Sequence, residues 1–238
     1  MPQWNPAPDQ FTLDANCVDV WLIQIDDEAP LPSLLDLLPP AERERAARFK
    51  FDKDRRLFAT AHASMRAILA KYLDGNPIEL EFIEGQNGKP KFSPDFARRK
   101  VEFNLSHSHQ AALLAVALGR VVGVDIEYIK RDFEFVEVAE RFFTMREVAA
   151  LRSLPSDLRR QAFFKCWTAK EAFLKAKGTG LSGALDEVEI ALNSEGQVKI
   201  SAAVPGWILT ELDSVDGYEA ALVYQESAAS IHSYRWSF

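Results

Sequence analysis

The sequence Val124-Asp125-Ile126 lies just past the middle of the 238-residue chain and is similar to Val18-Asp19-Val20 near its start. Three further pairs of segments have almost the same separation and occur in the same order. They are residues 65–69 with 170–174, residues 88–93 with 196–201, and residues 111–113 with 220–222. One match of this kind would mean little, but four in register indicate an internal duplication. We therefore expect an α+β fold of two similar lobes, packed as a pseudo-dimer with the active site in the cleft between them.

The periodicity of apolar residues supports the same division. Helical patterns cover residues 41–49 and 55–72 in the first half, and residues 133–143, 146–154 and 158–177 in the second. Runs with strand character cover residues 18–25, 80–83, 101–105, 111–118, 121–126, 188–192, 198–200 and 220–224. The order of strand, helices and strands thus occurs twice. We expect an N-terminal lobe of residues 1–119 and a C-terminal lobe of residues 120–238.

The composition excludes several classes of protein. With 47% hydrophobic and 26% charged residues the chain can bury an ordinary core. Its two cysteines, Cys17 and Cys166, are too few for a disulfide framework and form no C-x-x-C motif. A net charge of −7 does not favour nucleic acid or an anionic membrane as a partner. Because we find neither a secretory leader nor a run of about 18 apolar residues, we expect a cytoplasmic protein.

Three acidic residues fall on two predicted elements. Asp125 and Glu127 share one face of a strand, about 7 Å apart, where two carboxylates repel unless a cation lies between them. A helix over 158–177 places Glu171 and Lys175 one turn apart, on the flank of an apolar stripe. Taken singly, these acids and the Glu–Lys pair also suit a solvated surface. Together, with no histidine cluster, they favour Mg²⁺ over zinc, and Mg²⁺ implies a phosphate ester or anhydride as substrate.

Two other residues of the predicted helix are expected in the core. Lys170 falls near the middle of the apolar stripe, where a lysine needs a partner or must extend to solvent. Cys166 lies beside Trp167 on the same stripe with no base near it in sequence. We therefore interpret Cys166 as a packing residue rather than a nucleophile.

The motifs together resemble the surfactin-synthetase-activating (Sfp-like) class of 4′-phosphopantetheinyl transferases, which has two lobes. The matching segments are residues 88–90 (GKP), 103–108 (FNLSHS), 123–127 (GVDIE), 141–143 (RFF), 167–175 (WTAKEAFLK) and 178–181 (GTGL). They occur in the family's order and spacing. The resemblance implies transfer of the 4′-phosphopantetheine arm of coenzyme A to a serine of an apo acyl, peptidyl or aryl carrier protein, with release of adenosine 3′,5′-bisphosphate. It also implies a monomer.

The resemblance implies the site residues as well. Asp125, Glu127 and Glu171 would hold Mg²⁺ on the pyrophosphate; Glu171 would take the proton of the serine hydroxyl, and Lys175 would stabilise charge on the phosphates. The residues expected to contact coenzyme A are Arg45, Gly88, Lys89, Pro90, Asn104, Ser106 and His107. Glu42 falls where some members have a second basic residue, and Arg56 is a further candidate for a phosphate contact.

Two other functions stay open from the sequence. A metal-dependent hydrolase of nucleotide pyrophosphates would use the same three carboxylates, with water as the nucleophile. A non-catalytic module that binds carrier proteins would keep the fold without the chemistry. The clustered acids argue against such a module, because binding alone gives no evident reason to keep them.

Overall fold

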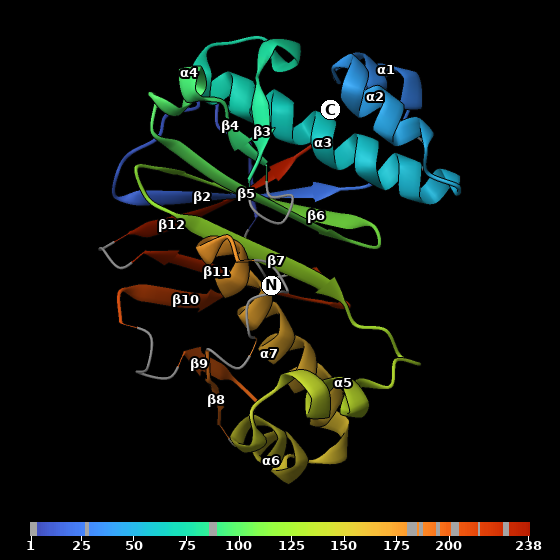
Figure 1. Cartoon of the computed structure of the whole chain (residues 1–238), viewed down its shortest axis with the longest axis vertical. Coiled ribbons are helices and arrows are strands. Elements are labelled where there is room, and N and C mark those ends of the chain that lie inside the picture. Colours follow the sequence, from blue (N-terminus) through green and yellow to red (C-terminus); the bar gives the residue numbers. More distant parts are fainter. Residues whose placement is uncertain are drawn as a thin grey trace.

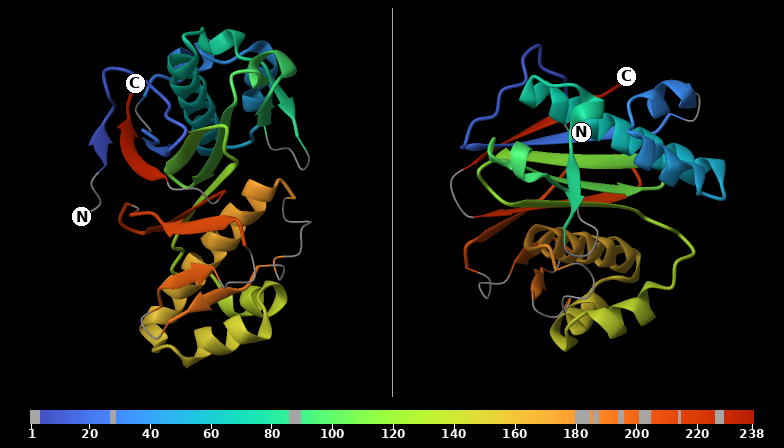
Figure 2. Two further views of the ribbon diagram at one scale, coloured as in Figure 1. Left: turned by 90° about the vertical axis from the view of Figure 1, so that its left-hand side faces the viewer. Right: turned by 45° about the horizontal axis from the view of Figure 1, so that its top comes forward.

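The computed structural model describes residues 4–26, 29–85, 90–179, 185, 188–193, 196–200, 205–213, 215–225 and 229–238. Within these residues two β-sheets lie between two long helices, one at each outer side (Figure 1). Figure 2 gives two further views of the same arrangement. None of the described helices is long and apolar enough to cross a membrane.

The first lobe starts with strand β2 (Cys17–Gln24) and three helices, α1 (Leu31–Asp36), α2 (Pro40–Ala47) and α3 (Asp52–Leu73). The elements that follow are η1 (Pro77–Glu79), β3 (Phe82–Glu84), β4 (Pro90–Phe92), α4 (Pro94–Ala97), β5 (Val101–Ser108) and β6 (Ala111–Leu118). Strand β6 has an unbroken apolar sequence because both of its faces are buried. Leu114 and Val116 face α3, whereas Leu113 and Ala115 face the three-stranded sheet of the second lobe.

The second lobe repeats this order. Its elements are β7 (Val122–Tyr128), α5 (Phe135–Phe142), α6 (Met145–Ser153), α7 (Ser156–Lys177), β8 (Ile190–Leu192), β9 (Val198–Ile200), β10 (Trp207–Glu211) and β11 (Tyr218–Gln225). Helices α3 and α7 each have 22 residues. The strand order β7-β11-β10 matches β2-β6-β5. The expected duplication into two similar α+β lobes is confirmed.

The last strand departs from the expected lobe boundaries. Strand β12 (Ser230–Trp236) lies in the sheet of the first lobe, where Ile231 pairs in parallel with Val18 of β2. The short strand β1 (Asn5–Pro6) pairs with its other edge, so the sheet order is β1-β12-β2-β6-β5. Strand β12 thus falls within the expected C-terminal lobe of residues 120–238 but extends the sheet of the first lobe. This pairing joins the two ends of the described chain, and no local pattern in the sequence indicates it.

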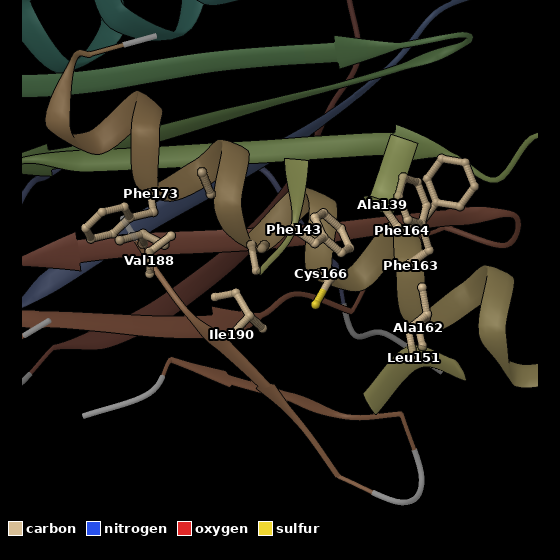
Figure 3. Close-up of a cluster of buried hydrophobic side chains, with 14 of the residues drawn as sticks. Ala139, Phe143, Leu151, Ala162, Phe163, Phe164, Cys166, Phe173, Val188 and Ile190 are labelled. Atoms are coloured by element: carbon tan, nitrogen blue, oxygen red, sulfur yellow. The ribbon is translucent and has the colours of Figure 1, made fainter. Parts of the chain in front are cut away.

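Helix α7 carries the core of the second lobe. Phe163 and Phe173 of α7 are buried in a cluster with Ile190 of β8 (Figure 3). Cys166 is fully buried in the same cluster, and burial raises the pKa of its thiol, so the expected packing role agrees with its surroundings. The structure also gives Lys170 the partner that its position requires, because its Nζ lies 2.7 Å from Oε1 of the buried Glu147.

Candidate active site

A glycine brings α7 against β7. A Cβ atom on Gly123 would lie 2.1 Å from the carbonyl oxygen of Ala172 and 2.4 Å from the amide nitrogen of Ala176, so only glycine fits there. The strand's period of two places Asp125 and Glu127 on the same face as Gly123. They therefore lie beside the helix face that carries Glu171 and Lys175, as the sequence predicted.

Asp125 is held at one oxygen only. Its Oδ1 accepts hydrogen bonds from Nζ of Lys175 at 2.6 Å and from Oγ of Ser106 at 2.7 Å. Its Oδ2 is buried and has no hydrogen-bond partner among the described residues. A buried carboxylate oxygen without a donor is costly unless a cation or another donor reaches it.

The other two acids are shifted toward their neutral forms. Burial, with added repulsion from Asp125, raises the pKa of Glu171 to about 7, although Lys175 opposes this rise. Burial and the charge of Asp125 also raise the pKa of Glu127. Oε1 of Glu171 is the second buried carboxylate oxygen here that lacks a partner within the described part of the chain. The repulsion among the three carboxylates is what a bound cation would relieve.

The donor set fits Mg²⁺ better than a metal held entirely by protein. Among the described residues, no group of three or more His, Cys, Asp and Glu side chains is placed so that it could hold a metal ion by itself. Mg²⁺ usually takes one or two carboxylates and completes its shell with water and substrate phosphates. The two partnerless oxygens, on Asp125 and Glu171, match that requirement.

Strand β5 of the first lobe is bonded to β7 of the second through side chains. Three alternate residues of β5 each accept a hydrogen bond from a β7 amide. The amides of Val124, Ile126 and Tyr128 donate to Oδ1 of Asn104 at 2.8 Å, Oγ of Ser106 at 3.4 Å and Oγ of Ser108 at 3.1 Å, respectively. The two sheets are thus joined beside the acidic cluster.

The predicted coenzyme A contacts fall in different environments. Asn104 and Ser106 are buried in the junction just described. His107 points to the other face of β5, and the residue as a whole is exposed. Nearby protein atoms remove part of the water around its ring, which lowers its pKa, and the charge of Lys175 lowers the pKa further. Arg45 is exposed on α2, with its guanidinium 5.3 Å from the ring centre of Phe58. Pro90 begins β4, whereas Gly88 and Lys89 lie outside the described residues.

Glu42 has a structural partner. Its two carboxylate oxygens accept hydrogen bonds from the buried guanidinium of Arg66 at 2.9 and 2.8 Å. Arg66 also donates to the carbonyls of Pro77 and Leu80. Glu42 is thus the counter-ion of a buried arginine. Arg56, the further phosphate candidate, donates to the carbonyl of Ala29.

One cavity borders the acidic cluster, and a second lies farther along α7. One, of about 150 Å³, has Glu127 and Lys130 at a largely apolar wall of Phe133, Val138, Phe163, Phe164 and Trp167. The other, of about 310 Å³, lies between β4 and the end of α7, where its lining includes Pro90, Lys91, Glu102, Val121, Lys177 and Gly178. Of the three acids, Glu127 alone lines either of these cavities.

Sequence reasoning assigned no role to Gly123 or Ser108. Gly123 was visible in the motif, but its importance depends on how closely α7 approaches. Ser108 follows Asn104 and Ser106 at the strand period of two, which was the available signal. Its Oγ donates to Oε2 of Glu127 at 2.7 Å.

Comparison with known proteins agrees with the motifs. Residues 121–223 match the 4′-phosphopantetheinyl transferase superfamily, and residues 27–118 match the family described as 4′-phosphopantetheinyl transferase, N-terminal. The chain is 40% identical over 220 residues to 4′-phosphopantetheinyl transferase HetI of Nostoc sp. (strain PCC 7120), with 92% of both chains covered. It is 30% identical to 4′-phosphopantetheinyl transferase Sfp of Bacillus subtilis (strain 168), over 70% of this chain and 71% of that one.

Proposed function

The chain belongs to the 4′-phosphopantetheinyl transferase superfamily, and on that premise we propose that it transfers the 4′-phosphopantetheine arm of coenzyme A to a serine of an apo carrier protein, with Mg²⁺, and releases adenosine 3′,5′-bisphosphate. One observation carries the proposal. Two buried carboxylate oxygens, Oδ2 of Asp125 and Oε1 of Glu171, have no hydrogen-bond partner among the described residues. A binding module without chemistry has no use for such a costly arrangement.

Asp125 and Glu171 would hold the metal through their partnerless oxygens, and Glu127 is the third ligand that the family resemblance implies. When bound, Mg²⁺ supplies positive charge to the pyrophosphate. The ammonium of Lys175, now 2.6 Å from Oδ1 of Asp125, keeps that carboxylate in place and presents a second positive charge at the same point. Both groups favour the charge that develops when the pyrophosphate bond breaks.

Glu171 is suited to take the proton of the attacking serine hydroxyl, either directly or through a water. A general base works best when its pKa lies near the working pH. Burial and the charge of Asp125 bring the pKa of Glu171 to about 7. This value applies to the site without a metal; a bound cation would lower the pKa of Glu171 and keep it in its charged form, which is the form that accepts a proton.

The first lobe supplies charge for the anionic end of coenzyme A. His107 and Arg45 interact electrostatically, and Lys175 acts on the same histidine from the second lobe. We assign His107 and Arg45 to the phosphates of coenzyme A, together with Lys89 of the 88–90 segment. Gly88 and Pro90 would border the ligand, and Asn104 and Ser106 would shape its site from the lobe junction.

The setting of the reaction is part of the proposal. Both lobes needed for the site are in one chain, which supports a monomer. The two cysteines are free, which agrees with a reducing, cytoplasmic compartment. The net charge of −7 supports partners other than nucleic acid or an anionic membrane.

Intact-mass measurement tests the proposal. An apo acyl carrier protein and an apo peptidyl carrier domain are incubated separately with the protein, coenzyme A and Mg²⁺, with and without EDTA. We expect a gain of about 340 Da, the mass of the arm, that EDTA abolishes. No gain on either carrier would contradict transfer to these two carrier types, and release of adenosine 3′,5′-bisphosphate without a carrier would instead indicate a hydrolase.

A further inference from the structure

The hydroxyls of Ser106 and Ser108 each bond to a backbone amide and a carboxylate of the second lobe. Each Oγ accepts a hydrogen bond from a β7 amide and donates its own hydrogen to an adjacent carboxylate. Ser106 donates to Asp125 and Ser108 to Glu127, both at 2.7 Å. A hydroxyl has only one hydrogen to donate. Because the amide donor occupies a lone pair of Oγ, that hydrogen points away from the amide and toward the carboxylate.

Ser108 therefore holds the Glu127 carboxylate at one oxygen. The other bond of its Oγ, from the amide of Tyr128 at 3.1 Å, is to the residue that follows Glu127 in β7. Ser108 is thus fixed to the same strand that carries its acid. A carboxylate held in this way by a neighbour binds a metal more tightly, because less side-chain freedom is lost on binding.

We propose that Ser108, a residue of the first lobe, is a positioning residue that holds Glu127 of the second lobe for Mg²⁺, so that metal affinity depends on the junction of β5 with β7. The inference rests on the proposed function. It adds a residue that acts through Glu127 and touches no reacting atom.

Ser108 is a better test of this idea than Ser106. Oγ of Ser106 also lies 2.7 Å from Nζ of Lys175, so its removal disturbs a lysine as well as Asp125. Among the described contacts, the carboxylate bond of Ser108 goes to Glu127 alone. Substitution of Ser108 therefore tests the position of Glu127 without removing a contact to the other site residues.

The first measurement is direct metal binding. Mn²⁺ replaces Mg²⁺ as a spectroscopic probe, and its dissociation constant is measured by electron paramagnetic resonance with coenzyme A present. We expect Ser108→Ala to raise this constant about 10- to 100-fold. Ser108→Thr keeps the hydroxyl and should restore affinity close to that of the unmodified protein. Ser153→Ala is the matched control, because the hydroxyl of Ser153 is exposed and donates to the carbonyl of Ala150 on α6.

The second measurement tests whether Ser108 acts through Glu127. In a double-substitution cycle with Glu127→Gln, the added effect of Ser108→Ala on Mn²⁺ affinity should largely disappear. Transfer by Ser108→Ala should recover as Mg²⁺ is raised to saturation, with the KM for coenzyme A unchanged. A general loss of structure would instead lower kcat at every Mg²⁺ concentration, and thermal unfolding of each variant detects it.

Three outcomes would overturn the inference. They are an Mn²⁺ dissociation constant in Ser108→Ala equal to that of the unmodified protein, an equal loss in Ser108→Thr, or additive effects in the Glu127→Gln cycle. Each can occur while the unmodified protein still transfers the arm, so failure here is distinct from failure of the proposed function. If the unmodified protein binds no Mn²⁺ with coenzyme A present, both the metal assignment and the inference are wrong.

Discussion

Asp19 of β2 and Asp125 of β7 occupy matching strand positions in the two lobes, but their hydrogen bonds differ. Both oxygens of Asp19 have donors, the hydroxyl of Tyr72 at 2.6 Å and Nδ1 of His232 at 3.0 Å. Asp125 has donors on one oxygen and a second, buried oxygen without a partner among the described residues. The same strand position is thus fully bonded in one lobe and able to take a ligand in the other.

The facing helices explain this difference. Tyr72 in α3 and Ala176 in α7 lie equally far from the starts of two helices of equal length. The tyrosine fills the space between helix and strand and bonds to Asp19, whereas the alanine lets α7 lie directly on Gly123. The duplicated lobes therefore share one arrangement of strands and helices. The residue between the long helix and the strand, Tyr72 or Ala176, decides which lobe can hold a ligand.

Each lobe has an ion pair between its long helix and the preceding helix, buried in the second lobe and partly buried in the first. Glu42 is the third residue of α2 and pairs with Arg66 of α3; Glu147 is the third residue of α6 and pairs with Lys170 of α7. Arg66 and Lys170 are again equally far from their helix starts. The pair fixes each long helix to the helix that precedes it. Since both lobes have this ion pair, we assign it a role in the stability of the fold rather than in the chemistry.

The largest expected effect separates the two aspartates. Asp125→Ala should reduce transfer roughly 10³-fold or more while the fold is kept, because it deletes charge and a proposed metal ligand. Asp19→Ala should lower the free energy of unfolding by about 2 kcal/mol, because it leaves Tyr72 without its acceptor. Its transfer rate should stay near normal while the protein is folded. Rates from a carrier mass assay and chemical denaturation check both, and a normal rate for Asp125→Ala would contradict the site.

The shared ion pairs should have the next largest effect, on stability. Lys170→Met leaves the buried Glu147 without its cation, and Arg66→Met leaves the half-buried Glu42 without its cation. We expect Lys170→Met to lower the free energy of unfolding by about 3–5 kcal/mol and Arg66→Met to lower it by less, both measured by urea denaturation. Glu42→Gln should lower stability and leave the KM for coenzyme A unchanged. A changed KM would show that Glu42 acts on the ligand and not only on Arg66.

Gly123 tests the close approach that exists in the second lobe. Gly123→Ala places a methyl group against the α7 backbone and should lower the free energy of unfolding by about 3 kcal/mol. Transfer should fall roughly 10²-fold because the acids of β7 and α7 move apart. Cys17→Ala, at the matching position before Asp19, is the control and should change neither quantity much. Normal transfer by Gly123→Ala would mean that the site tolerates a displaced helix.

The smallest expected effect concerns acid stability. His62 of α3 matches Cys166 of α7, and burial lowers the pKa of His62 to about 4. Below the unfolded-state pKa of about 6.5 the unfolded chain binds a proton that the folded chain does not, so stability falls as the pH drops from 6.5 toward 4. We expect a loss of about 2 kcal/mol over this window. His62→Cys should remove that part of the pH dependence, since a thiol stays neutral there; an unchanged slope would assign it to other groups.

The arrangement of strands and helices could be predicted from the sequence because it occurs twice. The apolar periods gave both long helices to within a few residues, and Lys170 on an apolar stripe required a partner. Asp125, Glu127, Glu171 and Lys175 were brought together by one strand and one helix, as expected. The partner of Lys170, the pairing of β12 with β2 and the bonds of Ser108 depend on residues far apart in the chain. Local periodicity carries no information about such contacts.

Strand β12 has a consequence for the order of events during synthesis. It lies between β1 and β2, so the whole second lobe leaves the ribosome before the sheet of the first lobe can be completed. Until then an edge of β2 has unpaired amides and carbonyls, which can pair with other chains. The sheet of the first lobe therefore stays incomplete until synthesis ends, and its exposed edge is the point at which a chaperone would be most useful.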